Sequence, residues 1–371
     1  MTIIIGIIGL GFLIFFHELG HYSAARFFGV KVEAFSVGMG PVLLHHTSRG
    51  GTDYRLSLIP LGGYCNMKGE HDYQKALEED LPQIEGEPDS FYGIHPLKRL
   101  AIAFAGPFFN VVFGFFSFAI IALMGYSYYS AGTTVSMADE MDASYTSPAH
   151  EAGMQSGDTI TAIDGKLMED FSDIAEYVST HPDEDIVISI TRNSESLDIT
   201  VHTLLDKETG AGKIGIVSSA DSVLERHYGP FSFFAALAEG GRQCGKLIGI
   251  TFKSISILFK GVDVTKAVSG PARITSMLGS TVTQGFAAGI HVGIVSTLQF
   301  LAFISVSLFI TNLLPMPVLD GGTILFSIFE TILRKRMPPK VLYYIQFIGI
   351  AFIGLLMILA ITGDVRYFFF K

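Results

Sequence analysis

Long stretches of apolar residues without a single charge recur along this chain of 371 residues. A helix needs roughly 20 apolar residues to cross a bilayer, and three of the stretches are longer than that. The first stretch is shorter, but a helix over about residues 3–28 would cross while holding three ionisable side chains. Because that segment lacks the basic start and cleavage site of a signal peptide, we expect it to remain. The pattern predicts four transmembrane helices, in segments 1–28, 97–126, 291–322 and 338–363.

The segments between the first two predicted helices have a different pattern. Residues 29–68 contain glycine-punctuated, partly alternating runs such as 54–59, which are typical of short strands and turns. We therefore expect a membrane-associated β-region there. Residues 69–96 follow, and eight acidic residues stand between 69 and 90 against the single Lys75. Such a run is typical of a solvated loop, and a binding tail is the alternative.

Two further segments separate the second and third predicted helices. Residues 130–219 have the composition of a soluble domain, with alternating strands at 186–190 and 197–201 and a helix near 173–179. Residues 225–290 are apolar again, but basic residues recur every seven positions at Lys246, Lys253 and Lys260. This pattern favours an amphipathic helix on a membrane surface over a spanning one. The fold class is thus a polytopic α-helical membrane protein with a membrane-associated β-region and an inserted α+β domain.

Composition and charge agree with this class. The mean hydropathy is +0.45 and only 16% of residues are charged, which argues against an ordinary soluble protein of this size. The two cysteines, Cys65 and Cys244, are too few for a disulfide framework, and we expect unpaired thiols. We expect no nucleic-acid partner.

Basic residues near the predicted helices set the orientation, because cytoplasmic flanks carry an excess of Lys and Arg. All clusters fall on one side of a four-helix arrangement, so residues 69–96 are expected in the cytoplasm. Both termini and the 130–219 domain are then expected outside it. The basic residues are Arg26 and Lys31, Lys98 and Arg99, and Arg334, Lys335, Arg336 and Lys340.

The strongest chemical signal lies inside the first predicted helix. His17-Glu18-Leu19-Gly20-His21 places two imidazoles at i and i+4 on one helical face, where both can reach one zinc ion. Glu18 stands beside them as a candidate base for water. Ionisable groups inside a membrane helix are costly and are usually functional. The alternative is a pair of core histidines with a neutral Glu18.

A catalytic zinc site needs a third protein ligand and an open position for water. Residues 312–322 place Asn312, Asp320, two prolines and two glycines at the end of the third predicted helix. Prolines break a helix, and broken backbone at membrane depth is tolerated only inside protein or beside a wet cavity. Asp320 is therefore the favoured third ligand, although it could instead cap a helix that starts at Thr323. Asn312 could stabilise a developing oxyanion or make an interhelical hydrogen bond.

These residues carry a resemblance to the site-2 protease family, and within it to the bacterial RseP-type regulated intramembrane zinc metalloproteases. The resemblance implies that His17, His21 and Asp320 bind Zn2+, that Glu18 is the catalytic base and that Asn312 assists. It also implies that strands within 29–68 engage an unwound substrate. The matching motifs are His17–His21, Gly51–Leu56 with Ile59–Tyr64, Ala105-Gly106-Pro107 with Asn110, Ser269-Gly270-Pro271, and Asn312–Asp320.

A second resemblance concerns the inserted domain. Residues 147–160, followed by Ile163-Asp164-Gly165, resemble the signature of a PDZ domain. Well-known relatives carry two such domains in tandem, whereas the space here holds one. A PDZ domain implies a peptide or protein ligand. The basic residues place this domain on the extracytoplasmic side, and the family resemblance implies that the membrane is the bacterial inner membrane.

The expected activity is zinc-dependent hydrolysis of a peptide bond within a transmembrane segment. The family resemblance suggests single-span substrates such as anti-sigma factors and remnant signal peptides. We expect Gly20, Gly321 and Gly322 to leave room around the metal for water. Two alternatives stay open: a membrane zinc protease that cuts soluble or peripheral peptides, and a non-catalytic PDZ membrane scaffold with a structural metal.

Overall fold

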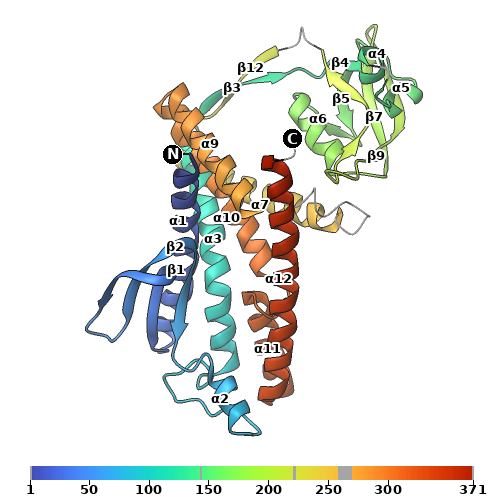
Figure 1. Ribbon diagram of the computed structural model, residues 1–371. Coiled ribbons are helices and arrows are strands. Elements are labelled where there is room, and N and C mark those ends of the chain that lie inside the picture. Colours follow the sequence, from blue (N-terminus) through green and yellow to red (C-terminus); the bar gives the residue numbers. More distant parts are fainter. Residues whose placement is uncertain (1, 143, 220–222, 258–269, 370–371) are drawn as a thin grey trace. The chain divides into compact units, whose positions relative to one another are not determined.

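The computed structural model describes residues 2–142, 144–219, 223–257 and 270–369 (Figure 1). The chain divides into two compact units. The first contains Met1–Leu123, Ser232–Ile248 and Ser269–Lys371, and the second contains Met124–Phe231 and Gly249–Val268. We describe each unit by itself.

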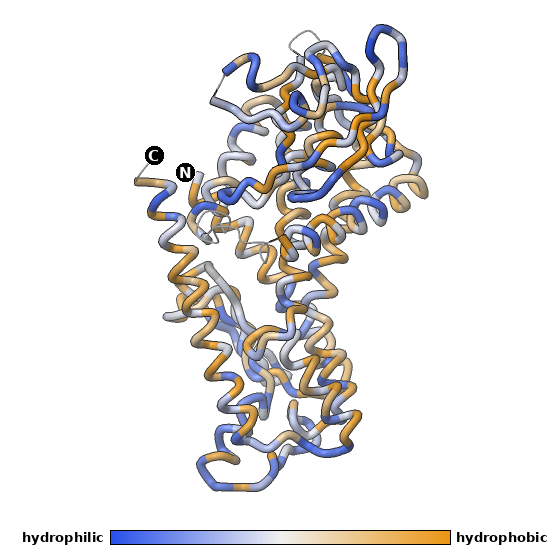
Figure 2. The backbone as a smooth tube through the Cα atoms, turned by 90° about the vertical axis from the view of Figure 1, so that its right-hand side faces the viewer, coloured by the Kyte–Doolittle hydropathy of each residue, from blue (hydrophilic) through white to orange (hydrophobic). Residues whose placement is uncertain are grey.

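Four helices of the first unit are long and apolar enough to cross a membrane, as the hydropathy pattern predicts. Figure 1 shows α1 and α10 running in one direction and α3 and α12 in the other, and hydrophobic residues follow their length in Figure 2. The third of them is shorter than predicted because it breaks after Asn312, and the fourth is longer. Their bounds are α1 (Thr2–Phe27), α3 (Pro96–Met124), α10 (Ile290–Asn312) and α12 (Pro339–Phe369).

Glycines allow the helices of this unit to approach closely. A Cβ atom on Gly6 would lie 1.9 Å from the Thr275 carbonyl oxygen of α9 (Pro271–Ala288), and one on Gly20 would lie 2.3 Å from the Ala105 oxygen of α3. No side chain fits at such distances, so α1 can meet both helices only through glycine.

The described part of the segment predicted to lie on the membrane surface contains two long helices. In α7 (Phe233–Ile257), Gly240 and Cys244 pack against α3, while α9 packs between α1 and α10. Neither is among the four candidate spans of the described chain. Because α9 belongs to the helix bundle, a surface position stays a prediction for α7 alone. Lys260 and Ser269 lie outside the described residues.

A bent sheet follows α1, formed by β1 (Val32–Thr47) and β2 (Asp53–Met67). Residues 34–37 pair with 63–66 on one side and with 53–56 on the other, and 42–47 pair with 53–57. Both strands therefore bend back on themselves, and the positive φ angles of Gly38, Gly40 and Gly62 permit the bends. Among the described residues, 63–67 pair only with β1, which leaves them as an edge.

The acidic segment is more ordered than a solvated loop. It contains α2 (Asp72–Glu78), and its apolar side chains Tyr73, Ile84 and Phe91 are buried in one cluster with Ile102. Two of its acidic side chains pair at the surface instead: Lys68 hydrogen-bonds Asp89 and Glu87, and it holds the pKa of the Asp89 carboxyl below its usual value. The apolar residues thus anchor an acidic surface.

A buried ion pair ties α3 to α11 (Asp320–Leu333), the helix that follows the break. Arg99 pairs with Glu330, which also accepts a hydrogen bond from the Met337 amide at 2.9 Å, and Arg99 lies over the ring of Tyr92. Arg99 is therefore not a free cytoplasmic charge, because Glu330 neutralises it. The other basic residues still predict the same orientation.

The second unit is an α+β domain with its own core. A four-stranded sheet has the order β6-β5-β7-β8, and the predicted strands and helix fall within β7, β8 and α6. The isoleucines at 160, 163, 186, 188 and 190 are almost completely buried. Its elements are β3 (Tyr126–Ala131), β4 (Val135–Met137), α4 (Ala138–Met141), α5 (Pro148–Glu151), β5 (Thr159–Ile163), β6 (Lys166–Leu167), α6 (Phe171–Ser179), β7 (Asp185–Arg192), β8 (Glu195–His202), β9 (Leu204–Leu205), β10 (Gly212–Lys213), β11 (Ile216–Ser218) and β12 (Val223–Tyr228).

Candidate metal centre

The two histidines of α1 lie one turn apart and face the same way. Their Nε2 atoms are 3.1 Å apart, and their ring centroids are separated by 4.8 Å. His21 also contacts α3, where its Nδ1 lies 2.9 Å from the Ile102 carbonyl oxygen. Because a carbonyl can only accept, Nδ1 carries the proton and Nε2 is left with a lone pair for a metal.

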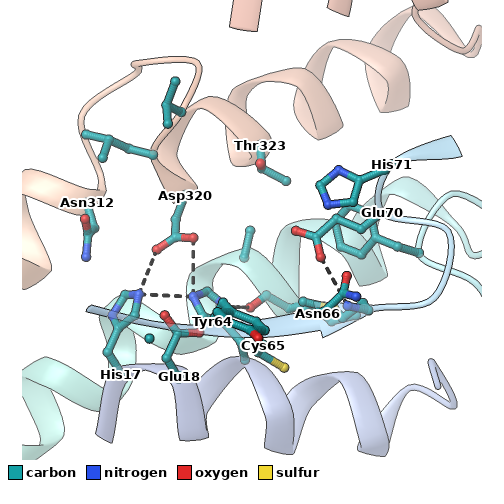
Figure 3. A pocket seen from close by; sticks show the side chains of 18 of the residues that line it. His17, Glu18, Tyr64, Cys65, Asn66, Glu70, His71, Asn312, Asp320 and Thr323 are labelled. Carbon is teal, nitrogen blue, oxygen red and sulfur yellow. Dashed lines mark hydrogen bonds and ion pairs between the residues drawn. The ribbon is translucent and has the colours of Figure 1, made fainter. Parts of the chain in front are cut away.

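Asp320 meets both histidines from the other end of the chain. Its two carboxylate oxygens lie 3.2 Å from His17 Nε2 and 3.3 Å from His21 Nε2 (Figure 3). The three ligand atoms lie within 4.8 Å of one another. The fold thus brings together His17, His21 and Asp320, the three residues that the sequence favoured as metal ligands.

The break between α10 and α11 positions Asp320 beside the two histidines. After Asn312 the chain turns tightly, and Leu319 precedes the first residue of α11, which is Asp320 itself. A Cβ on Gly321 would lie 2.1 Å from the Leu314 oxygen, and one on Gly322 would lie 2.4 Å from the Met316 oxygen. These glycines therefore make room for backbone, and Gly20 does the same against α3. Our expectation that they leave room for metal and water was wrong.

The donor set fits zinc. Two imidazole nitrogens and one carboxylate oxygen are ligands that Zn2+ accepts, and three protein ligands leave the open position of a catalytic site. A structural zinc would need a fourth protein ligand, and no other His, Cys, Asp or Glu of the described chain joins this cluster.

Glu18 lies beside the cluster on the same helix. Its carboxylate lies near the Cys65 backbone N–H, which belongs to the edge of the sheet. A carboxylate held there is placed to exchange a proton with a water molecule in the cavity. Asn312 lines the same cavity, and its side chain has no hydrogen-bond partner among the described residues.

A cavity of about 620 Å3 surrounds these groups. Its other walls, which the sequence did not predict, are the sheet edge at 63–67, Arg55, Glu70, His71 and Thr323. Burial raises the pKa of the Glu70 carboxyl, which accepts from the Met67 amide at 3.1 Å. Nothing local in the sequence pointed to these residues, because they come from the sheet, the acidic segment and α11.

Gly106 is the glycine that faces the metal ligands. A Cβ atom there would lie 2.1 Å from His21 Nε2, so even alanine would displace the ring. We expect Gly106→Ala to lower the zinc content of the purified protein well below one ion per chain, with at least a tenfold loss of hydrolysis. Atomic absorption measures the zinc. Gly354→Ala is the matched control, because a Cβ there meets nothing within 4 Å, and full zinc in Gly106→Ala would contradict the geometry.

Comparison with known proteins agrees with this chemistry. The family description "Peptidase family M50" matches residues 5–356. The chain belongs to this family. Its members are the site-2 proteases, which are membrane-embedded zinc enzymes, so this member is a zinc metalloprotease and the non-catalytic scaffold is set aside.

Relatives of this M50 chain extend over its full length. A protein of Treponema pallidum is 35% identical and covers 100% of both chains. One of Campylobacter jejuni is 34% identical over 96% of this chain and 91% of its own, and one of Rhizobium meliloti is 32% identical over 97% and 95%. All three carry the name "putative zinc metalloprotease".

Proposed function

We propose that this M50 protein cuts transmembrane segments of single-span proteins inside the bilayer, with anti-sigma factors and remnant signal peptides as its substrate class. One observation carries the proposal. His17 and His21 lie on a helix apolar enough to span a membrane, and Asp320 meets them where another such helix breaks. Cleavage within the membrane is general for the M50 family.

The proposed mechanism assigns each group one task. His17, His21 and Asp320 would hold zinc, which would supply Lewis acidity at the scissile carbonyl. Glu18 takes a proton from the attacking water and passes it to the leaving amide nitrogen. Asn312 donates to the oxyanion, and its lack of another partner favours this task over an interhelical hydrogen bond.

The sheet edge at 63–67 would hold the substrate in an extended form. The peptide groups of a transmembrane helix are hydrogen-bonded to one another within the helix. The helix must therefore unwind locally before water can attack a peptide bond. The N–H groups of Cys65 and Met67 point away from β1, toward Glu18 and Glu70, and the cavity runs along them. A substrate strand added there would place its peptide bonds beside the metal ligands.

Gly63 tests this edge. A Cβ on Gly63 would lie 3.3 Å from the Glu18 Cγ and 2.8 Å from the Ser36 oxygen, so alanine would push the edge away from α1. A shift of about 1 Å can cost about 100-fold in rate, and we expect Gly63→Ala to lose 10- to 100-fold in cleavage. Zinc content should stay at the wild-type level, since Gly63 touches no ligand. Unchanged cleavage would argue against strand addition.

The bilayer is the proposed partner of the sheet. Large apolar side chains around its bends are exposed, and a soluble protein rarely shows such a contiguous patch. Lipid would cover them. They are Met39, Val42, Leu43, Leu44, Leu56, Leu58 and Ile59.

The second unit is proposed to be a PDZ domain that binds a peptide or protein. Support comes from its own core and from the motif around Asp158. Burial alone would raise the pKa of the Asp158 carboxyl, but hydrogen bonds from Arg192 and the Gln155 amide outweigh this and lower it. Positive φ angles at Gly157 and Gly165 fit the turns of the motif. Basic residues favour an extracytoplasmic position, on the bacterial inner membrane.

The deciding experiment compares two substrates with the same residues around the cut. One is a single-span protein inserted in liposomes with the purified protease, and the other is a soluble peptide. Cleavage within the inserted span, located by mass spectrometry, supports the proposal. Cleavage of the soluble peptide alone would favour the alternative, a membrane protease for soluble or peripheral peptides.

A further inference from the structure

One face of α3 contacts both histidines at their Nδ1 atoms, whereas Asp320 lies beside their Nε2 atoms. The Ile102 carbonyl accepts from His21 Nδ1 at 2.9 Å, and the Asn110 amide lies 3.1 Å from His17 Nδ1. Residues 102, 106 and 110 follow one another at intervals of four, which places them along one stripe of the helix. Gly106, between the other two, lies against His21.

The histidine tautomers follow from the position of Asp320. Both Nε2 atoms face its carboxylate, so a metal at this point binds both rings through Nε2. A neutral ring that binds through Nε2 carries its proton on Nδ1 and needs an acceptor there. His21 has the Ile102 carbonyl for this purpose, and His17 has the amide of Asn110.

The Asn110 side chain is unusually placed for a residue in an apolar helix. It is 0% exposed, and its Oδ1 atom has no hydrogen-bond partner among the described residues, while Nδ2 is the atom beside His17. With a proton on His17 Nδ1, two donors would face each other. Turning the amide by 180° brings Oδ1 to Nδ1, because its two ends have nearly the same shape. The turn gives Oδ1 a donor and needs no repacking.

We propose that Asn110 is a positioning residue for the metal centre, whose Oδ1 accepts the His17 Nδ1 proton and so holds the ring in its metal-binding tautomer. Turned the other way, the amide would donate from Nδ2 to Nδ1 and suit the other tautomer, whose proton on Nε2 faces Asp320. The amide serves both tautomers, which a carbonyl of the helix backbone cannot do. This inference rests on the proposed metal centre.

The contact by which Asn110 joins two helices uses its backbone, not the side-chain amide that lies beside His17. Its backbone oxygen, not its side chain, joins α3 to α10, by accepting from Ser305 Oγ at 2.9 Å. Ser305 is also 0% exposed, so Ser305→Ala disturbs the same helix contact without touching the amide. It is the matched control.

The test measures zinc affinity by chelator competition on the full-length protein in detergent, with the unfolding temperature of the metal-free form recorded for each variant. We expect Asn110→Leu to bind zinc about 10- to 100-fold more weakly. Asn110→Asp, which keeps an acceptor oxygen, should remain within a few fold of the wild type. Ser305→Ala should keep wild-type affinity. If Asn110→Leu does not fold, Asn110→Ala tests the same loss with less bulk.

His17→Ala separates this inference from the proposed centre. Wild-type affinity in Asn110→Leu together with a large loss in His17→Ala would overturn the role of Asn110 alone. Wild-type affinity in His17→Ala would overturn the metal centre itself. The absorption spectrum of the Co2+ form is the second readout: an altered spectrum in Asn110→Leu and a restored one in Asn110→Asp are expected, and identical spectra in all variants would contradict the proposal.

Discussion

Glu18→Gln is expected to reduce cleavage by about 100- to 10,000-fold, the range that a positioned general acid–base group contributes. Glutamine keeps the shape of the side chain but cannot take up a proton. It also keeps an oxygen that can accept from the Cys65 backbone N–H, so the sheet edge should remain in place. Cleavage of a single-span protein in liposomes measures the effect.

The zinc content of Glu18→Gln shows whether the variant has lost only its general base or its whole metal centre. Glu18 is not among the three clustered ligand atoms, so Glu18→Gln should hold as much zinc as the wild type. Zinc loss together with inactivity would mean that Glu18 is needed for the metal. Equal cleavage by both proteins would point to a contaminating protease.

Asp320→Ala is expected to remove most of the zinc and, with it, all measurable cleavage. The carboxylate supplies one of three ligand atoms and the only negative charge among them. Two histidines on one helix turn cannot hold the ion at comparable affinity, since a catalytic zinc site uses three protein ligands. Zinc per chain, measured after dialysis against a weak chelator, checks this.

Asn312→Ala is the matched control for Asp320→Ala, because it lies on the other side of the same break. It should keep full zinc and lose only part of the rate, about 100-fold if its amide binds the oxyanion. If Asp320→Ala kept its full zinc content, the third ligand would have to be a residue other than Asp320. Zinc loss in Asn312→Ala would instead show that the break itself had been disturbed.

How much of the candidate site could be predicted depends on how far apart its residues lie in the sequence. His17 and His21 were readable from a spacing of four, because a helix brings such residues to one face whatever surrounds it. The prediction of Asp320 needed one further inference: a helix end broken by prolines lies at the same membrane depth as the histidines. The cavity walls at Arg55, Glu70 and Thr323 had no local signal.

Hydropathy decided the four long helices before any fold was known, since a bilayer demands long charge-free runs and such runs are visible in one dimension. It could not set where the third helix ends, because the tight turn after Asn312 depends on Gly321 and Gly322 fitting against distant carbonyls. A β-region was expected in residues 29–68, but its pairing could not be predicted, since it joins 34–37 to two separate segments of β2. The contacts of Ile102, Gly106 and Asn110 could not be predicted either. These residues form a stripe on one apolar helix, and the sequence does not show which helix packs against that stripe. Local periodicity therefore determined the spans and the histidine pair, and contacts between distant segments decided which residues lie beside the histidines: Asp320, the sheet edge at 63–67 and the stripe on α3.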